Sequence, residues 1–387
     1  MKIGAVGFGN RIAHVFYELK QINKDAEMVA FVDPQPIGKK FAIEKNIFPL
    51  TEYNSLDEML QKEKLDLLMV GSPNHLHIEH IQKGLESGVK IFSEKPIVAN
   101  EEQTWKLSKL IKEYGKENIL VGLVLRYSKH ARFLRELIKK DTLGKIISLE
   151  ASEHIMPWHG GFFMRNWRRK TSYSGGFMLE KCCHDIDFYS MVVGCRPIKV
   201  ASFGGRRSFI PENSPNLQNN ENMDVYQKYN LLGWESEEKV FDSDADIVDH
   251  QVAIIQYENG AILSFHTNMN VPDEFRRFAI IGSKGMVEGD FVRGFFKAHN
   301  SHNGKKIIDE NFGAAFQQGT KGHYGADQLM LKDINNYLIS NNNHELPVNV
   351  IDCMEAGLVA MKIDEARNTG QIIDLTQTWN KLDNFNL

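Results

Sequence analysis

Apolar residues in the first third of the chain come in short runs, and amphipathic stretches separate these runs. The runs occupy residues 2–6, 28–32, 67–70, 89–92 and 119–123, and runs of this length predict buried strands. Between them, residues 11–20, 55–61, 77–87 and 101–114 place apolar side chains at helical spacing. This alternation of strand and helix predicts a doubly wound parallel sheet, the Rossmann arrangement, over residues 1–125.

The pattern changes after Arg126. A helix is predicted at residues 131–140, and alternating or β-rich segments follow at 145–153, 198–206, 251–257, 261–268, 276–281 and 285–288. Glu258-Asn259-Gly260 supplies a hairpin turn between two of them. Apolar faces at 326–339 and 350–368 predict helices that pack back against the body of the protein. Residues 126–387 therefore predict an α+β domain with a large, mostly antiparallel open sheet.

One segment of this second part lacks a clear period. Residues 211–246 are rich in Asn, Glu and Ser. We expect a long surface insertion there, in a position to cover a site.

Composition narrows the class of protein. The 387 residues are 42% apolar and 25% charged, with a net charge of -4, so a nucleic-acid partner is not expected. No apolar run approaches the roughly 20 residues of a membrane span, and the N-terminus predicts no signal peptide. The four cysteines are too few and too clustered for a disulfide framework, which favours a soluble, cytoplasmic protein.

A glycine turn follows the first predicted strand. Gly7-Phe8-Gly9 opens a helix there, and backbone amides at such a helix start can bind a pyrophosphate. The third glycine of the dinucleotide fingerprint is replaced by Ile12, so the strand must pack on the helix in another way, for example through Ala13. The residues expected at the cofactor here are Gly7, Phe8, Gly9, Asn10, Arg11 and Ile12.

Asp33 ends the second predicted strand, 24 positions after Gly9. A carboxylate there can accept hydrogen bonds from ribose hydroxyls and repels a 2′-phosphate, which favours NAD over NADP. Two alternatives remain: Asp33-Pro34 as a turn, and Lys39 with Lys40 as partners of a phosphate.

Three further motifs carry a resemblance to a known family. They are the turn Ser72-Pro73-Asn74-His75-Leu76-His77, the turn Glu94-Lys95-Pro96, and Gly175-Gly176 followed by the helix that holds Glu180, His184 and Asp187. With the glycine turn, these motifs resemble, in order, those of the glucose-fructose oxidoreductase / inositol dehydrogenase (Gfo/Idh/MocA) family. The resemblance implies NAD(P)-dependent oxidation or reduction of a sugar or cyclitol, and a homodimer or homotetramer assembled through the C-terminal sheet.

The resemblance also implies roles for individual residues. Lys95 and His184 would be catalytic, and Glu180 would assist them from a position where aspartate is more familiar. Chemistry supports these roles, because oxidising a hydroxyl needs a base such as histidine and a cation beside the changing oxygen. Ser72, Pro73, Asn74, His77, Glu94 and Lys95 would complete the cofactor site.

Other side chains are candidates for binding the substrate. The aromatic and basic run at residues 154–169 suits stacking on a sugar ring, and a subunit contact is the alternative. Arg126 either borders the site or forms a salt bridge between the domains. The substrate-binding candidates are Arg126, Trp158, Trp167, Arg168, Asp187 and His323.

Cys182 and Cys183 beside His184 resemble a metal-ligand set in composition. Neighbouring helix residues diverge, whereas zinc favours thiolates two to four residues apart, so we expect no metal and interpret the thiols as packing groups. Two other functions remain open. One is a glycoside hydrolase that uses NAD for a transient oxidation and elimination, and the other is a nucleotide-binding protein without catalysis.

Overall fold

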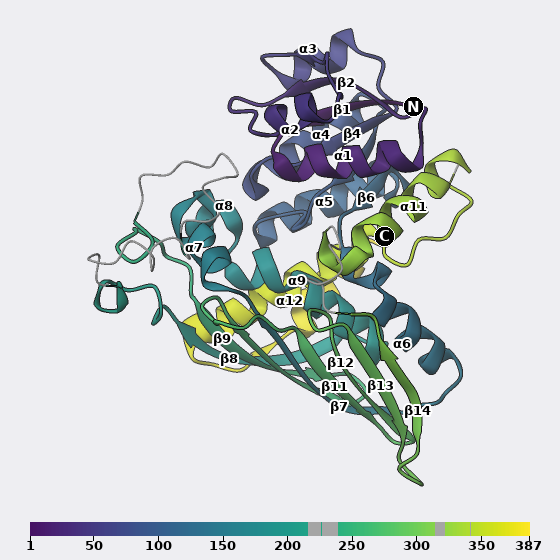
Figure 1. Ribbon diagram of the computed structural model, residues 1–387, viewed down its shortest axis with the longest axis vertical. Helices are drawn as coiled ribbons and strands as arrows, with labels where there is room; N and C mark the ends of the chain where they lie inside the picture. The colour runs from purple at the N-terminus through teal and green to yellow at the C-terminus, as the bar shows by residue number, and fades with distance from the viewer. Residues whose placement is uncertain (216–225, 227–238, 314–321, 341) are drawn as a thin grey trace.

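The computed structural model describes residues 1–215, 226, 239–313, 322–340 and 342–387, and these form two sheets joined through a layer of helices (Figure 1). The first sheet lies at the top of Figure 1 and the second at the bottom. Most of the segment predicted as a surface insertion, at 216–225 and 227–238, lies outside the described residues. Within the described ones, no helix is long and apolar enough to cross a bilayer.

The first sheet is parallel and has the strand order β3-β2-β1-β4-β5-β6. Its strands are β1 Lys2–Val6, β2 Glu27–Val32, β3 Thr51–Glu52, β4 Leu67–Val70, β5 Lys90–Ser93 and β6 Ile119–Val121. Every β4 residue is buried, as expected for a strand covered on both faces. The order reverses at β1, and a doubly wound sheet opens its ligand crevice at that point, beyond the carboxyl ends of the strands. The predicted Rossmann sheet is confirmed.

Helices cover this sheet, and several have the caps that their sequences encode. They are α1 Asn10–Ile22, α2 Gly38–Glu44, α3 Leu56–Lys62, α4 His77–Glu86 and α5 Glu101–Tyr114, with short 3₁₀ turns η1 Asn74–Leu76, η2 Lys116–Asn118 and η3 Val124–Tyr127. The Ser55 and Asn100 side chains cap α3 and α5 by accepting backbone N–H bonds. The short elements α2 and β3 were not predicted.

The second sheet has the order β14-β13-β12-β11-β7-β10-β9-β8-β15. Its strands are β7 Ile146–His154, β8 Pro197–Gly205, β9 His250–Tyr257, β10 Ile262–Asn268, β11 Arg277–Gly282, β12 Gly285–Asp290, β13 Phe295–Asn300, β14 Lys306–Asn311 and β15 Ile373–Asp374. The β7–β10 pair is parallel and the other pairs are antiparallel. Gly260 takes φ +86° in the turn between β9 and β10, which confirms the predicted hairpin.

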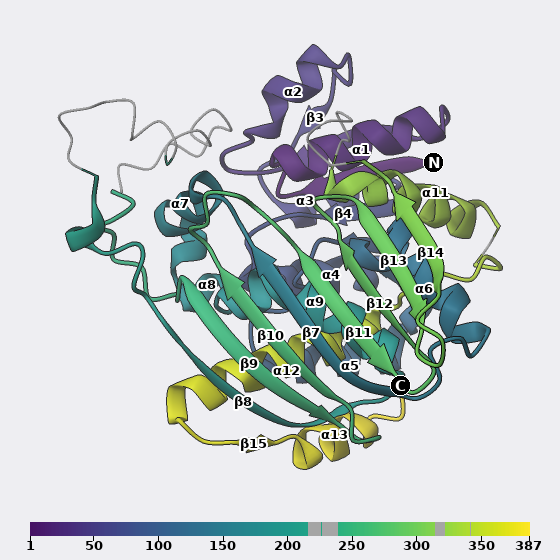
Figure 2. The ribbon, with the colours of Figure 1, turned by 60° about the horizontal axis from the view of Figure 1, so that its bottom comes forward.

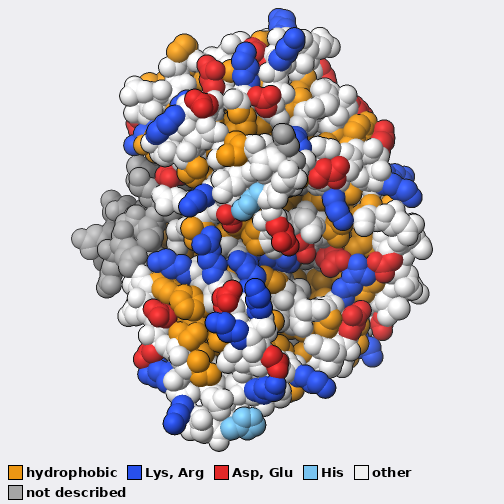
Figure 3. All heavy atoms as spheres, turned by 90° about the vertical axis from the view of Figure 1, so that its right-hand side faces the viewer, with side chains coloured by type: hydrophobic (Ala, Val, Ile, Leu, Met, Phe, Trp, Pro, Cys, Tyr) orange, Lys and Arg blue, Asp and Glu red, His pale blue; other side chains and the backbone are white. Residues whose placement is uncertain are grey.

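Helices lie on one face of this second sheet (Figure 2). The helical segments of this part are α6 Lys129–Lys139, α7 Pro157–Arg165, η4 Trp167–Arg169, α8 Thr171–Ser174, α9 Phe177–Val193, η5 Pro211–Asn213, η7 His323–Gly325, α11 Ala326–Ile339, α12 Val350–Thr369 and α13 Thr376–Asp383. α9 packs against α12, and α11 contacts α1 of the first part. In Figure 3, charged side chains of both signs gather where the two parts meet. The helix α9 lies between the two sheets (Figure 1), and its polar residues Glu180, His184 and Asp187 are buried.

Candidate active site

The glycine turn after β1 leaves the start of α1 open. Gly7 has φ +78°, and a Cβ there would lie 2.1 Å from the backbone nitrogen of Ser72, so only glycine fits. A Cβ at Gly9, in contrast, would meet nothing within 4 Å. Gly9 is the N-cap residue of α1 and supplies no side-chain hydrogen bond there, and uncapped N-terminal amides suit a pyrophosphate. These residues fit a dinucleotide cofactor.

Ile12 occupies the position of the missing third glycine, and the structure shows how it is accommodated. Its side chain is 1% exposed. A Cβ at Gly71, just beyond β4, would lie 2.1 Å from Ile12 Cγ1. The room that a glycine in α1 usually provides is therefore provided by Gly71, directly after β4.

Asp33 lies directly after β2, half-buried. Its Oδ1 accepts the backbone N–H of Gln35 at 2.7 Å, and burial raises the pKa of its carboxyl. The Asp33-Pro34 turn and a ribose partner are both compatible with this geometry. Lys39 forms an ion pair with Glu52 at 2.9 Å, so one of the two lysines considered for a phosphate already has a carboxylate partner.

The turns after β4 and β5 are tied together and reach the second part of the chain. The His77 ring lies between the backbone oxygens of Ser72, at 2.7 Å, and Pro96, at 2.9 Å. The Lys95–Pro96 peptide bond is cis. Asn74 donates from Nδ2 to the Ser174 backbone oxygen at 2.8 Å and to Glu180 Oε2. Asn74 therefore connects the first sheet to the start of α9.

Lys95, Glu180 and Arg168 form a charged cluster at the start of α9. Lys95 Nζ donates to the backbone oxygen of Glu180 and lies 4.0 Å from Glu180 Oε1. Arg168 Nε donates to the same Oε1 at 2.7 Å. Burial raises the pKa of Glu180, but the positive charges of Lys95 and Arg168 outweigh this effect and the pKa is lowered. Glu180 is therefore held ionised.

His184 lies one helical turn beyond Glu180 on α9. Its side chain is 2% exposed, and neither ring nitrogen has a hydrogen-bond partner among the described residues. Burial, and then the positive charge of Lys95, holds its pKa well below the ordinary value. The imidazole is therefore neutral at pH 7, with a nitrogen lone pair that can accept a proton.

His323 approaches His184 from the segment before α11. The ring centroids are 5.5 Å apart. His323 Nδ1 lies 3.1 Å from Asp327, whose carboxylate also binds Arg11 through two bonds of 2.7 and 2.9 Å. Arg11 Nε donates to Glu94 at 2.7 Å. Arg11, predicted as a cofactor contact, thus links α1 to the segment that carries His323.

The backbone around His323 is strained. His323 and Tyr324 have φ of +39° and +61°, a left-handed conformation that costs about 1–2 kcal/mol per non-glycine residue. Such strain is often retained where a side chain must point into a functional site.

The other residues predicted to bind the substrate have different partners in the structure. Arg126 forms a bidentate pair with Asp187, at 2.7 and 2.9 Å, and also contacts Asp352, which is the salt-bridge alternative. Trp158 lies in α7 and donates to the Met156 sulfur. Trp167 stacks under the Arg168 guanidinium at 4.2 Å.

A buried network beside His184 was not predicted from the sequence. Lys181 pairs with Glu153 at 3.0 Å, and Glu153 pairs with Arg276 at 2.9 Å. Arg276, 1% exposed, forms two bonds to Asp185. The alternation of β7 was the available signal in the sequence. Glu153 lies on the same buried face as Leu149 and Ala151, and a charged residue on such a face needs a partner.

The thiols next to His184 are buried. Cys182 and Cys183 are 0% and 1% exposed, and burial raises the pKa of Cys183 to about 12. Among the described residues, no group of three or more His, Cys, Asp or Glu side chains could hold a metal ion.

Both parts of the chain match models of one known protein family. Residues 1–123 match the family model for the Gfo/Idh/MocA oxidoreductases, described as the NAD-binding Rossmann fold, and residues 135–375 match the model of the C-terminal alpha/beta domain of the same family. The protein YteT of Bacillus subtilis is 23% identical, over 85% of this chain and 87% of its own length.

Solved structures show the same fold. Apo scyllo-inositol dehydrogenase from Lactobacillus casei has a TM-score of 0.71 and 20% identity, covering 97% of this chain and 98% of its own. The WlbA dehydrogenase from Bordetella pertussis, solved with NADH and UDP-GlcNAcA, has a TM-score of 0.70 and 17% identity, covering 97% of each chain.

Proposed function

The chain belongs to the Gfo/Idh/MocA family of NAD-binding oxidoreductases, and from this premise we propose that it transfers a hydride between NAD and a hydroxyl-bearing carbon of a sugar or cyclitol. Inositol dehydrogenases are among the proteins with the same fold. The proposed catalytic residues are Lys95, His184 and Glu180.

One observation carries this proposal. A neutral, buried histidine without a described partner lies one helical turn from the carboxylate that Lys95 approaches. Lys95 comes from the turn after β5, at the carboxyl edge where a dinucleotide binds, and His184 comes from α9. A substrate between the two parts of the chain would meet both.

The proposed role of each residue follows from its charge. NAD, when bound, accepts or returns the hydride. A His184 ring nitrogen takes the hydroxyl proton during oxidation and returns it during reduction. The Lys95 ammonium stabilises negative charge on the substrate oxygen. Glu180 is a positioning residue as well as a site carboxylate, because it fixes Lys95 and Arg168.

The glycine turn supports the cofactor assignment. Gly7, Phe8, Gly9 and the start of α1 would hold the pyrophosphate, and Asp33 would accept hydrogen bonds from the adenosine ribose. A carboxylate there disfavours a 2′-phosphate. We therefore propose NAD as the preferred cofactor over NADP.

The far face of the second sheet supports the proposed homo-oligomer. Large apolar side chains on β8, β9, β10 and β11 alternate outward and are exposed, including Phe203, Val252, Ile254, Ile262 and Ile281. Figure 2 shows the described helices behind this sheet. Exposed large apolar side chains gathered on one face typically mediate association. We propose that this face forms a dimer or tetramer, and that the protein is cytoplasmic.

Light scattering of the wild type and of the double variant Phe203→Glu/Ile254→Glu tests the assembly. The variant should have a lower molar mass in solution than the wild type, and equal masses would contradict the proposed interface.

A substrate panel tests the function. Cyclitols, aldoses, uronates and glycosides are each incubated with NAD or NADP, and the nicotinamide absorbance is followed. Net NADH with at least one sugar or cyclitol is the expected result. Release of sugar from a glycoside without net NADH would instead indicate the hydrolase, and NAD binding without either reaction would indicate the non-catalytic protein.

A further inference from the structure

Arg168 presents an unused half of its guanidinium next to Lys95. Its Nε binds Glu180 Oε1 at 2.7 Å. Its terminal nitrogens, Nη1 and Nη2, have no partner among the described residues, although the side chain is only 23% exposed. A guanidinium has five N–H donors in a fixed fork, so four donors remain available to a ligand.

The guanidinium is held in place from several sides. It lies 4.2 Å from the Trp167 ring centroid and 5.2 Å from that of Phe162, which are cation–π distances. Its backbone N–H binds the Asn166 side chain at 2.8 Å. The fork is therefore pre-organised, which lowers the entropy lost when it binds a ligand.

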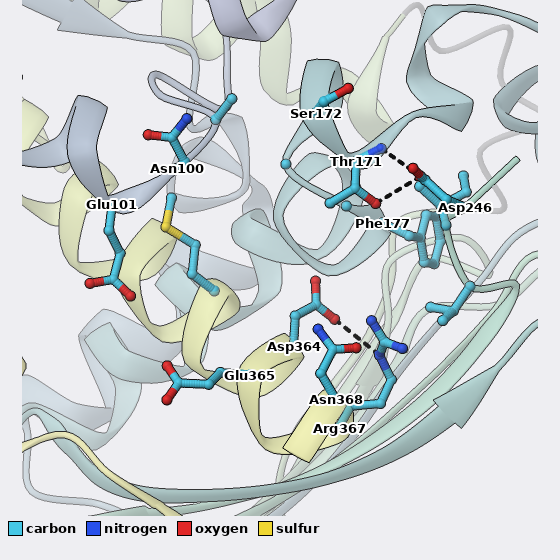
Figure 4. Close-up of a pocket in the computed structure, with 16 residues that line it drawn as sticks. Asn100, Glu101, Thr171, Ser172, Phe177, Asp246, Asp364, Glu365, Arg367 and Asn368 are labelled. Carbon is cyan, nitrogen blue, oxygen red and sulfur yellow. Dashed lines mark hydrogen bonds and ion pairs between the residues drawn. The ribbon is translucent and has the colours of Figure 1, made fainter. Parts of the chain in front are cut away.

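The segment that carries Arg168 is also anchored. In the close-up of the 720 Å³ cavity behind the start of α9, the Thr171 amide and hydroxyl point to the Asp246 carboxylate (Figure 4), with bonds of 2.6 and 2.9 Å. Lys170 pairs with Asp244 at 2.7 Å. Neither Arg168 nor Lys95 lines that cavity, so the guanidinium does not serve it.

The charges around Arg168 leave one positive charge in excess. Glu180 is the sole carboxylate within 4.0 Å of either Lys95 or Arg168 among the described residues. The neighbouring carboxylates of Glu153 and Asp185 are already paired within the buried Lys181–Arg276 network. Two cations thus share one anion at the place where the proposed substrate would bind.

Resting on the proposed function, we propose that the substrate carries a carboxylate, which binds the terminal nitrogens of Arg168 while Lys95 faces the reacting oxygen. The substrate class is then the uronates and related sugar acids. An arginine fork matches a carboxylate with two parallel hydrogen bonds. A carboxylate contributes a single negative charge, which balances the excess, whereas a phosphate dianion would leave an unpaired negative charge in a poorly hydrated site.

Matched substrate pairs test this inference on the full-length enzyme with NAD. Glucose, galactose and mannose are compared with glucuronate, galacturonate and mannuronate, and with the hexose 6-phosphates, by kcat/KM. Within each active pair we expect the uronate to exceed the hexose by about 10- to 100-fold, the range for hydrogen bonds to a charged group. The hexose 6-phosphates should not reach the kcat/KM of the uronates.

A pair of variants assigns the effect to Arg168. Arg168→Lys keeps the charge beside Glu180 but loses the fork, so the ratio of kcat/KM for the uronate to kcat/KM for the hexose should fall by about 10- to 100-fold. Arg169→Lys is the control, because Arg169 binds Asp244. Binding of the uronate to the NAD-loaded enzyme, measured by calorimetry, should weaken in parallel.

The outcomes are distinguishable. Three results would overturn the carboxylate inference and leave the proposed dehydrogenase activity intact. They are oxidation of the hexoses as efficient as that of the matched uronates, a preference for the hexose 6-phosphates, and an equal loss of kcat/KM in Arg168→Lys for hexose and uronate. No oxidation of any sugar, sugar acid or cyclitol, in these pairs or in the substrate panel of the function test, would contradict the proposed function itself, and the inference with it.

Discussion

Gly71→Ala should destabilise the fold by overpacking the contact between β4 and α1. An ideal Cβ at this position would lie 2.1 Å from Ile12 Cγ1, 2.8 Å from Ile12 Cδ1 and 3.1 Å from the backbone oxygen of Gly7. Gly71 is not among the glycines with positive φ, so the substitution tests packing and not backbone strain. Ile12 is buried and cannot swing into solvent.

The magnitude follows from the cost of extra atoms in a packed core. Inserting a methyl group into such a contact costs about 1–3 kcal/mol. Urea unfolding of the cofactor-free protein, followed by circular dichroism, should show a lower midpoint with an unchanged slope. Ile12→Ala removes the two atoms nearest to the new methyl group. The double variant should therefore lose less stability than the sum of the two single variants, with a coupling of about 0.5–3 kcal/mol.

Two results would refute this reasoning. If Gly71→Ala unfolds at the wild-type midpoint, the contact is not tight. If the double variant loses the full sum, Ile12 and Gly71 do not compensate for each other.

Three further predictions concern the cofactor and the base. Gly9→Ala should keep wild-type stability, because its Cβ meets nothing within 4 Å, yet weaken NAD binding in a fluorescence titration; unchanged affinity would place the pyrophosphate elsewhere. Asp33→Ser should narrow the preference for NAD over NADP by about tenfold, and wild-type dissociation constants that favour NADP would contradict the role of Asp33. Because burial and Lys95 lower the pKa of His184 from 6.5, it stays a neutral base as pH falls, so the acid limb of kcat/KM should lie below pH 6.5. A limb above that value would point to another group.

Local patterns carried much of the fold. Short apolar runs predicted β1 and β4, and helical spacing predicted α5, because each of these elements follows its own period. β13 and β14 were not predicted because their sequences mix charged and apolar residues without a clear period. They form strands because they pair at one edge of the second sheet. α7 was read as an aromatic run because Gly160 and Gly161 are poor helix formers, and tertiary packing overrides that propensity.

Some residues of the candidate site could be predicted from the sequence and others could not. The motifs identified Lys95, Glu180 and His184, which the structure brings together from two parts of the chain. The contact of Arg168 with Glu180 and that of Arg11 with Asp327 could not be predicted from the sequence, because the partners are 12 and 316 positions apart and belong to different elements. The i, i+4 spacing of His323 and Asp327 at a helix start was a usable signal for the latter carboxylate.

The most direct test of the proposed chemistry is the effect of His184→Asn on kcat/KM with the best substrate of the panel. General base catalysis typically contributes about 10²- to 10⁴-fold, so we expect a loss of that size with unchanged NAD affinity, while His302→Asn, at an exposed turn, keeps wild-type activity. Lys95→Met should show a comparable loss. Wild-type kcat/KM in both His184→Asn and Lys95→Met would contradict the catalytic assignment on which the account depends.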